Sequence, residues 1–504
     1  MIAPDSDRRE PAAATPAAAG AHSTAVVPST AAEVRRGAVV RLRIESLAFG
    51  ARGVAHVGRY AVFVDGGLPG QEVAARVVKR RNDFAEAAVE EVLAPGEGDV
   101  APRCRHFGVC GGCSLQHYDY ALQLEAKRRQ VVELLRRVGG LGEIDVAPAA
   151  ASPEVYGYRN KMEFSFARDG WKVMRPAPRA DDAAGAATAV LGLHPRGRFD
   201  RSLEIDECHL GSERMIAALR VVRRLAAESG LPAFSTRTQE GFWRFLVLRE
   251  GKRTGDLLVN LVTNRYALGS REERAVRDTA AEVAREVPGV TGVVSNQTAR
   301  LAAVAYGEEE RMVIGRPTIR EALGGLTFEI SANSFFQTNT LQAERLFERL
   351  IERAGLTGGE TVYDLYCGAG SISLLAARRA ASVIGIEGND AAIGDAERNA
   401  ALNGVTNCRF LVGDLKDALR IHGAGLPPPD VVILDPPRAG AHPRALADLA
   451  RLAPPLILYV SCNPATLARD LAALATAGYR AETAEPFDMF PHTPHVEVMV
   501  GLRR

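Results

Sequence analysis

The sequence predicts an α/β protein that ends in a doubly wound, Rossmann-like domain. From about residue 331 to the C-terminus, apolar strand-like runs alternate with helical stretches. This alternation predicts a mostly parallel sheet with helices on both faces. Several of the runs end in residues that can carry chemistry, and ligands of open sheets bind at the carboxyl ends of the strands. We therefore expect a ligand and the reactive groups to meet at one edge of this sheet.

Four segments are predicted along the 504 residues. The first is rich in alanine and proline and has no apolar signal-peptide core, so we expect a disordered tail. The second contains short strands separated by glycines, which is typical of a small OB-like β-barrel that binds nucleic acid. The third mixes strands and helices in an α+β domain, and the fourth is the Rossmann-like domain. The predicted boundaries are residues 1–36, 37–95, 96–325 and 326–504.

The composition is that of an ordinary globular protein: 47% of the residues are hydrophobic, 24% are charged, and the net charge is +1. No apolar run approaches the roughly 20 residues of a membrane helix. An odd number of clustered cysteines without a signal peptide favours a reducing compartment, so we expect a cytoplasmic protein. A monomer without an obligate protein partner is the default expectation. Basic patches at 79–81, 127–129 and 159–161 could contact phosphate. Single patches of this kind are more often solvated surface.

A glycine-containing turn follows the first strand of the Rossmann-like domain. Gly368 and Gly370 let the backbone approach a ligand closely, and Glu387 follows Gly368 by 19 residues, where an acid can accept the hydroxyls of a ribose. Ser373 occupies the place of the third glycine of a dinucleotide fingerprint. Asp414 ends the next predicted strand and could accept the adenine amine. The alternative is an α/β domain that binds another nucleotide, or none.

Two later strands end in reactive residues. The strand 431–434 runs into Asp435, and the strand 455–461 runs into Cys462. A lone cysteine is more often an inert core thiol, but a position at the end of a strand favours a nucleophile here. Near the C-terminus, Glu497 is a candidate acid/base residue. The nearby histidines, His492 and His495, are rival candidates, and lone histidines more often have a structural or substrate-orienting role.

Five motifs, in this order, resemble the RNA (uracil-5-)-methyltransferase family, and the resemblance covers roughly residue 37 to the C-terminus. They are Phe-Phe-Gln-Thr-Asn at 335–339, Asp-Leu-Tyr-Cys-Gly-Ala-Gly at 364–370, Asp-Pro-Pro-Arg at 435–438, Val-Ser-Cys-Asn-Pro-Ala-Thr at 460–466 and Phe-Pro-His-Thr-Pro-His-Val-Glu at 490–497. The resemblance implies that the C-terminal domain is an S-adenosylmethionine-dependent methyltransferase. It further implies that the pocket for S-adenosylmethionine uses Gln337, Tyr366, Ser371, Glu387, Asp414 and Asp435.

The chemistry of such an enzyme explains why it needs a cysteine. C5 of uracil becomes nucleophilic only after a thiolate adds to C6, and a base must later remove the C5 proton. The resemblance implies that Cys462 is the nucleophile, that Glu497 is the base and that Asp435 holds the uracil edge. Cytosine-specific relatives carry a second cysteine in the Asp-Pro-Pro region, and this chain has Arg438 after the prolines instead.

Four of the seven cysteines form a candidate metal site: Cys104, Cys110, Cys113 and Cys208. Their spacing suits either zinc or an iron–sulfur cluster. The resemblance implies a [4Fe–4S] cluster, and it identifies the barrel as a TRAM domain. It also favours structured RNA as the substrate, with 23S rRNA ahead of tRNA. The alternative from another functional class is a non-catalytic iron–sulfur RNA-binding protein on a methyltransferase scaffold.

Overall fold

The computed structural model describes residues 27–28, 30–142, 144–168, 170–171, 189–422 and 425–504. It contains two compact units. One comprises the chain up to Glu45 together with Gly53–Gly96, and the other comprises Ser46–Arg52 together with Glu97–Arg504. Most of the predicted tail, and a loop expected at residues 176–187, lie outside the described residues. No helix in the described part of the chain is long and apolar enough to cross a membrane.

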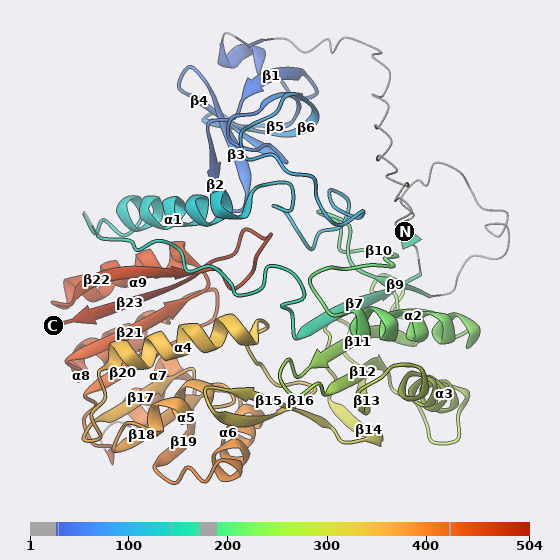
Figure 1. Cartoon of the computed structure of the whole chain (residues 1–504), viewed down its shortest axis with the longest axis vertical. Coiled ribbons are helices and arrows are strands. Elements are labelled where there is room, and N and C mark those ends of the chain that lie inside the picture. The colour runs from blue at the N-terminus through green and yellow to red at the C-terminus, as the bar shows by residue number, and fades with distance from the viewer. Residues whose placement is uncertain (1–26, 29, 143, 169, 172–188, 423–424) are drawn as a thin grey trace, which may run out of the picture. The chain divides into compact units, whose positions relative to one another are not determined.

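The predicted OB-like barrel is drawn in blue in Figure 1, and its strands other than β2 (Ser46–Ala48) lie mainly in the first unit. Its sheet has the strand order β1-β5-β6-β4-β3-β2. Ordered structure begins before residue 36, the predicted end of the tail. Val34 is fully buried in the barrel core, and it follows a short 3-10 helix, η1 (Ala31–Glu33). The strands are β1 (Val39–Arg43), β2 (Ser46–Ala48), β3 (Arg52–Val57), β4 (Tyr60–Asp65), β5 (Glu72–Arg80) and β6 (Phe84–Ala94).

The second unit begins with a long helix, α1 (Tyr120–Arg137), and continues into a mixed sheet with the order β14-β13-β12-β11-β7-β9. Helices α2 (Glu213–Glu228) and α3 (Arg271–Glu286) bury their apolar side chains against this sheet. The strands are β7 (Lys161–Ala167), β9 (Val190–Gly192), β11 (Trp243–Glu250), β12 (Leu257–Asn264), β13 (Val290–Thr298) and β14 (Glu309–Gly315), and β8 (Gly170–Trp171) pairs with β10 (Ser202–Leu203).

A hairpin leads into the C-terminal sheet. It consists of β15 (Thr318–Leu323) and β16 (Leu326–Ser331), and the predicted boundary between residues 325 and 326 falls in its turn. This boundary stays a prediction, because the hairpin and both sheets belong to the same compact unit.

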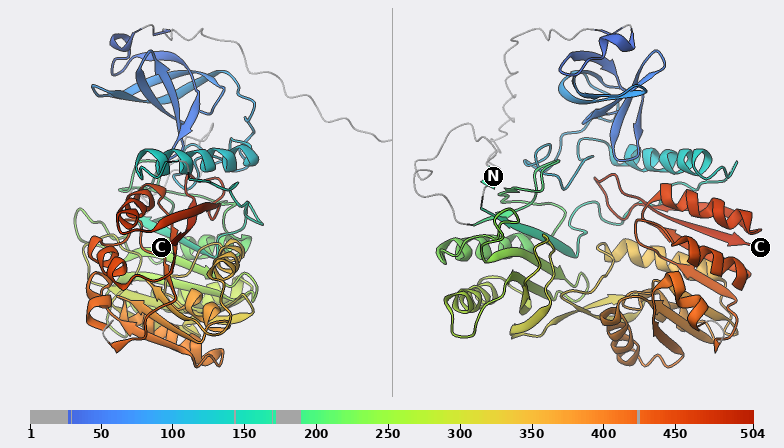
Figure 2. Two further views of the ribbon diagram at one scale, coloured as in Figure 1. Left: turned by 90° about the vertical axis from the view of Figure 1, so that its left-hand side faces the viewer. Right: turned by 180° about the vertical axis from the view of Figure 1, so that it is seen from behind.

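The C-terminal sheet has the order β19-β18-β17-β20-β21-β23-β22 and the predicted α/β architecture. Two separate cores cover its faces: α4, α5 and α6 pack on one face, and α1, α7, α8 and α9 pack on the other (Figures 1 and 2). The strands are β17 (Thr361–Leu365), β18 (Ser382–Glu387), β19 (Cys408–Val412), β20 (Val431–Leu434), β21 (Leu456–Ser461), β22 (Arg480–Phe487) and β23 (Glu497–Arg503). The helices are α4 (Thr340–Ala354), α5 (Ser371–Ala377), α6 (Asp390–Leu402), α7 (Leu415–His422), α8 (Pro443–Leu452) and α9 (Pro464–Thr476).

The strand order determines where a ligand can bind. From β17 the chain proceeds outward through β18 and β19, and then returns to β20 on the other side of β17. Such a reversal leaves a crevice at the carboxyl ends of the two strands, and nucleotides bind there. The last strand, β23, is antiparallel to β21, with Ser461 opposite Val498. The beginning of β23 therefore lies at the same edge as the end of β21.

Side-chain caps explain why the helices begin directly behind this edge. Asn339 caps α4 by accepting the N–H of Gln342 at 3.2 Å, and Asn463 caps α9 by accepting the N–H of Ala465 at 3.1 Å. Pro464 at the first position of α9 suits a helix start, since its nitrogen has no hydrogen to satisfy. Cys462 is consequently held between the end of a buried strand and a capped helix.

Candidate active site

A cavity of about 750 Å³ opens at the carboxyl edge of the C-terminal sheet, and this volume lies within the range of small-molecule sites. It lies at the crevice that the strand order predicts. Residues at the carboxyl ends of four strands, at the beginning of β23 and in the segment before α4 meet in it. The predicted site residues that line it are Gln337, Tyr366, Glu387, Asp435, Cys462 and Glu497.

The turn after β17 is tight and strained. Tyr366 has a φ of +67° and Gly368 a φ of +53°. A positive φ is costly for a residue other than glycine, and such residues cluster at functional sites. The turn is held against the neighbouring strand, because the N–H groups of Tyr366 and Cys367 donate to the carbonyl of Ile386 at 2.9 and 3.2 Å. It brings Tyr366 and the backbone of Gly368 to the cavity wall.

The acid at the end of β18 is fixed in place. The Glu387 carboxylate accepts the N–H of Gly368 at 3.3 Å and the N–H of Asn389 at 2.9 Å. It faces the cavity beside the glycine turn, where an acid can accept the hydroxyls of a ribose.

Ser373, which replaces the third glycine of a dinucleotide fingerprint, has a structural partner. Its hydroxyl donates to the fully buried Asp364 at 2.6 Å. This bond ties α5 to β17. Burial raises the pKa of the Asp364 carboxyl to about 7, although the bond from Ser373 opposes the shift.

Two residues of the predicted cofactor set do not line the cavity. Ser371 is the first residue of α5. Asp414 is exposed and forms an ion pair with Lys416 at 2.6 Å. Their assignment to the cofactor stays a prediction. In the same region Asn389 and Asp395 do line the cavity, and no motif in the sequence pointed to them.

Three proton-binding groups lie together at the reactive end of the cavity. Burial raises the pKa of the Cys462 thiol to about 12, and the nearby Glu497 and Asp435 add to this shift. Burial raises the pKa of Glu497, and Asp435 raises it further. Burial also raises the pKa of Asp435, while its hydrogen bond with Gln337 opposes the change. Arg438 counteracts the effect of the two acids on Cys462 and the effect of Asp435 on Glu497.

The two candidate histidines differ in position. His495 lines the cavity and contacts a guanidinium nitrogen of Arg438 at 3.3 Å. His492 is buried and lies outside the cavity lining. Burial lowers the pKa of both rings to about 4, so both are neutral near pH 7. Sequence reasoning also missed the cavity residues Asn333, Ser334, Phe335 and Phe490, although two of them lie within the quoted motifs.

Comparisons with known proteins agree with this geometry. The family model described as tRNA (Uracil-5-)-methyltransferase matches residues 281–504, and the TRAM domain model matches residues 33–89. A protein of Chlorobaculum tepidum named as an uncharacterized RNA methyltransferase is 41% identical, over 88% of this chain and 91% of its own. The chain belongs to the RNA (uracil-5-)-methyltransferase family. It is therefore an enzyme that transfers methyl groups from S-adenosylmethionine to RNA.

Other members of this RNA methyltransferase family extend the match along the chain. A second protein named as an uncharacterized RNA methyltransferase, from Nitratidesulfovibrio vulgaris, is 39% identical over 92% of this chain and 96% of its own. A solved structure of the Pyrococcus abyssi tRNA (uracil-54, C5)-methyltransferase, in complex with S-adenosyl-L-homocysteine, aligns with a TM-score of 0.70 at 30% identity. The alignment covers 92% of this chain and 99% of that one.

The four predicted metal ligands of this methyltransferase lie around a second cavity of about 300 Å³. None of the four forms a disulfide bond. Among the residues that the structure describes, no three His, Cys, Asp or Glu side chains are arranged to hold a metal ion as they stand. Burial raises the pKa of Cys110 to about 11 and of Cys113 to about 12, and the other thiols of the set add to both shifts. The donors themselves suit a thiolate-bound metal, since N–H groups of Gly112 and Gln116 point at the sulfurs of Cys110 and Cys113, at 3.4 and 3.2 Å.

The residues of the basic patches lie in different environments. Lys127 fits neither a phosphate contact nor solvated surface, because its side chain is 1% exposed and forms an ion pair with Asp488 at 2.6 Å. Lys161 forms an ion pair with Glu163 and lines the cysteine cavity. Arg159 lines both the cysteine cavity and the larger cavity, so it remains available to a ligand.

Proposed function

We propose that this enzyme methylates C5 of one uridine in a folded RNA through a covalent adduct between Cys462 and C6 of the uracil. The arrangement of Cys462, Asp435 and Glu497 around one cavity, beside the glycine turn, is the observation that carries this proposal. A nucleophile and a second proton-binding group within reach of the same ring are what the reaction requires.

In the first half of the reaction the Cys462 thiol gives its proton to water in the open cavity, and the thiolate adds to C6. The electron pair of the C5–C6 double bond moves toward O4, and the resulting enolate attacks the methyl group of S-adenosylmethionine through C5. S-adenosylhomocysteine leaves as a neutral product. The positive sulfonium suits this site, because a cation near Asp435, Cys462 and Glu497 favours the ionised thiol.

In the second half, C5 carries both the new methyl group and its original hydrogen. The Glu497 carboxylate takes this proton, the C5–H electron pair re-forms the C5–C6 double bond, and the C6–S bond breaks to release the Cys462 thiolate. Burial suits Glu497 to this role, because a carboxylate with a raised pKa is a stronger base. Asp435 would hold the uracil edge next to the methyl donor.

The nature of the RNA is a separate part of the proposal. A stacked base cannot reach Cys462, so we propose that the uridine is flipped into the cavity, with the TRAM domain binding RNA elsewhere. The barrel and the four-cysteine pattern favour 23S rRNA. A tRNA is the second candidate, because the solved Pyrococcus abyssi relative is named for uracil 54 of tRNA.

The proposal predicts a defined loss of 5-methyluridine. RNA from a strain that lacks this gene should lose the modification at a single uridine, mapped by mass spectrometry of nuclease fragments. Wild-type protein should restore it, and Cys462→Ala protein should not. The RNA that loses the modification, ribosomal or transfer RNA, is the substrate. Unchanged 5-methyluridine throughout, with RNA binding by the purified protein intact, would favour the non-catalytic RNA-binding alternative.

We further propose that Cys104, Cys110, Cys113 and Cys208 hold a [4Fe–4S] cluster. Methyl transfer requires no redox step, so a cluster here would hold the surrounding segments in place. Protein purified without oxygen should contain about four iron atoms per chain, and Cys113→Ser protein should lose most of them, whereas Cys408→Ser protein should keep them. Stoichiometric zinc in place of iron would contradict the cluster and indicate a structural zinc site.

A further inference from the structure

The segment between β22 and β23 carries much of the reactive end of the cavity. We call residues 488–496 the base loop, because it leads directly into Glu497. Phe490 and His495 of this loop line the cavity. His492 has a φ of +64°, which is strained for a residue with a side chain. The loop therefore needs support from outside to keep its shape.

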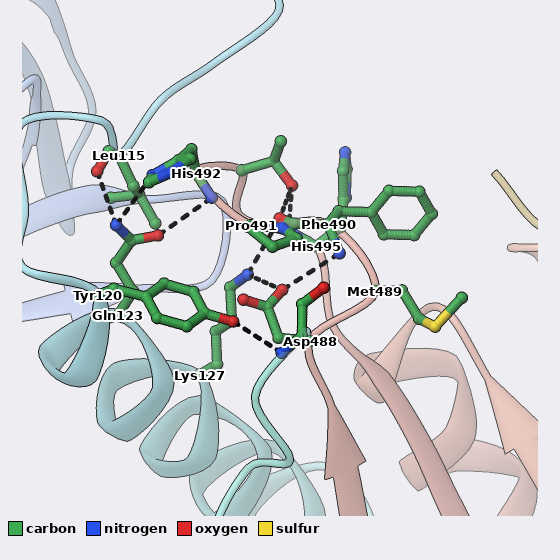
Figure 3. A network of polar contacts seen from close by, with 12 residues as sticks. Leu115, Tyr120, Gln123, Lys127, Asp488, Met489, Phe490, Pro491, His492 and His495 are labelled. Atoms are coloured by element: carbon green, nitrogen blue, oxygen red, sulfur yellow. Dashed lines mark hydrogen bonds and ion pairs between the residues drawn. The ribbon is translucent and has the colours of Figure 1, made fainter. Parts of the chain in front are cut away.

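Helix α1 provides part of this support through a buried ion pair (Figure 3). Lys127 donates to a carboxylate oxygen of Asp488 at 2.6 Å and to the carbonyl of Phe490 at 3.3 Å. The side chains of Lys127 and Asp488 are 1% and 0% exposed. Burial lowers the pKa of Lys127, and Asp488 opposes this shift. Such a pair is costly to break by removing one member, since the other charge stays buried without a partner.

One turn earlier on the same helix, Gln123 forms hydrogen bonds with the next part of the base loop (Figure 3). Its amide oxygen accepts the N–H of His492 at 3.1 Å, and its amide nitrogen lies 3.3 Å from Nδ1 of the same ring. The amide nitrogen also donates to the carbonyls of Leu115 and Tyr118, at 3.0 and 2.7 Å. Gln123 is fully buried, so it joins the strained residue of the loop to the segment that precedes α1.

That segment connects the base loop with the cysteine cavity. The N–H groups of Ser114 and Leu115 donate to the carbonyl of His492 at 2.9 and 3.0 Å. The next residue, Gln116, accepts the N–H of Cys104 at 3.1 Å and donates to the sulfur of Cys113 at 3.2 Å. The segment 114–116 is thus hydrogen-bonded to two cysteines through the side chain of Gln116 and to the base loop through its backbone.

We propose that Gln123 and Lys127 are positioning residues for the second half of the reaction. They hold the base loop in the shape that presents Glu497 to the C5 proton, and the segment 114–116 completes the support from the cysteine side. The inference rests on the proposed function. Neither residue lines the cavity, so the initial addition of Cys462 to C6 depends on them much less than the later proton removal does.

The two halves of the reaction can be measured separately. RNA with 5-fluorouridine at the target position reports the first half alone, because fluorine at C5 cannot be removed as a proton and the covalent adduct persists. Ordinary RNA reports the complete reaction through released 5-methyluridine. With ordinary RNA, we measure the fraction of enzyme that remains covalently bound to methylated RNA on denaturing electrophoresis. This fraction rises when removal of the C5 proton is slow.

Gln123→Leu is the main variant, since it removes the contacts to the loop without leaving a buried charge unpaired. We expect kcat for released 5-methyluridine to fall by up to about 10²-fold, which is the effect of small displacements of a catalytic group. The methylated adduct should accumulate on ordinary RNA. The rate of adduct formation with 5-fluorouridine RNA and the KM for S-adenosylmethionine should stay near the wild-type values.

A second variant, Lys127→Met combined with Asp488→Leu, replaces the ion pair by apolar groups of similar size, and it should show the same accumulation.

Glu125→Gln is the matched control on the exposed side of α1, where Glu125 pairs with Arg129 of the same helix; it should behave like wild type. Equal slowing of both halves in Gln123→Leu would indicate a merely structural role, and unchanged turnover without accumulated adduct would also overturn the inference. If wild-type protein forms no adduct with 5-fluorouridine RNA, the proposed function itself fails. The two failures are therefore distinguishable.

Discussion

Cys462→Ala protein is expected to transfer no measurable methyl group to RNA, because alanine cannot add to C6 and C5 of the uracil then stays unreactive. Removal of a nucleophile from an enzyme costs on the order of 10⁶-fold in kcat. The measurement is incorporation of labelled methyl groups from S-adenosylmethionine into target RNA. The variant should also form no adduct with 5-fluorouridine RNA, and it should still bind S-adenosylmethionine in calorimetry.

Cys408→Ala is the control for this prediction. Cys408 begins β19 and contacts the carbonyl of Ser373 at 3.6 Å, and it does not line the cavity. This variant should keep wild-type activity. The prediction is contradicted if Cys462→Ala protein makes 5-methyluridine, or if it forms the adduct while Cys408→Ala protein does not.

The pH dependence of the first half follows from the raised pKa of Cys462, about 12 in the absence of ligands. Only the thiolate attacks, so adduct formation with 5-fluorouridine RNA should accelerate by up to about tenfold per pH unit from pH 6 to 9. A bound sulfonium lowers the thiol pKa and shifts the whole curve to lower pH. A rate that is independent of pH over this range would show that thiolate formation does not limit the reaction.

Glu497→Gln protein should complete the first half and stop before the second. Loss of a general base typically slows a reaction by about 10² to 10⁴-fold, so released 5-methyluridine should fall by that factor while the methylated adduct accumulates on ordinary RNA. Denaturing electrophoresis followed by mass spectrometry of the trapped nucleotide checks this outcome. His495→Gln is the comparison variant, because His495 lines the same cavity. Accumulation of adduct in His495→Gln protein and not in Glu497→Gln protein would transfer the base role to the histidine.

The same substitution should stabilise the fold in a pH-dependent way. The pKa of Glu497 is raised from the ordinary 4.5, so the folded state binds a proton that the unfolded state releases, and stability falls as the pH rises from about 4.5 toward the raised pKa. A glutamine at position 497 does not titrate, so this loss of stability is absent from the variant. The melting temperature of Glu497→Gln protein should therefore exceed that of wild type by an amount that grows with pH, whereas the exposed Glu397→Gln control should show no such trend.

Local patterns in the sequence were sufficient for several of the secondary-structure elements and for the strand-end positions of the reactive residues. Alternation of apolar and polar residues predicts β1, and the helical stretch near residues 120–137 agrees with α1. The positions of Asp435 and Cys462 after apolar runs predict that both lie at the ligand edge, and both line the cavity. These features depend on neighbours within a few residues, so they can be read directly from the chain.

Tertiary structure alone decided which of these residues meet. Glu497 reaches the edge occupied by Cys462 because β23 inserts antiparallel between β21 and β22, and strand pairing of this kind depends on distant segments. The partner of Lys127 is 361 residues away, so one lysine of a patch that looks like surface in the sequence is buried against the base loop. Asp414 follows a neighbouring strand, yet it forms an ion pair with Lys416 and does not line the cavity, so a position at a strand end does not by itself decide which side chains meet there.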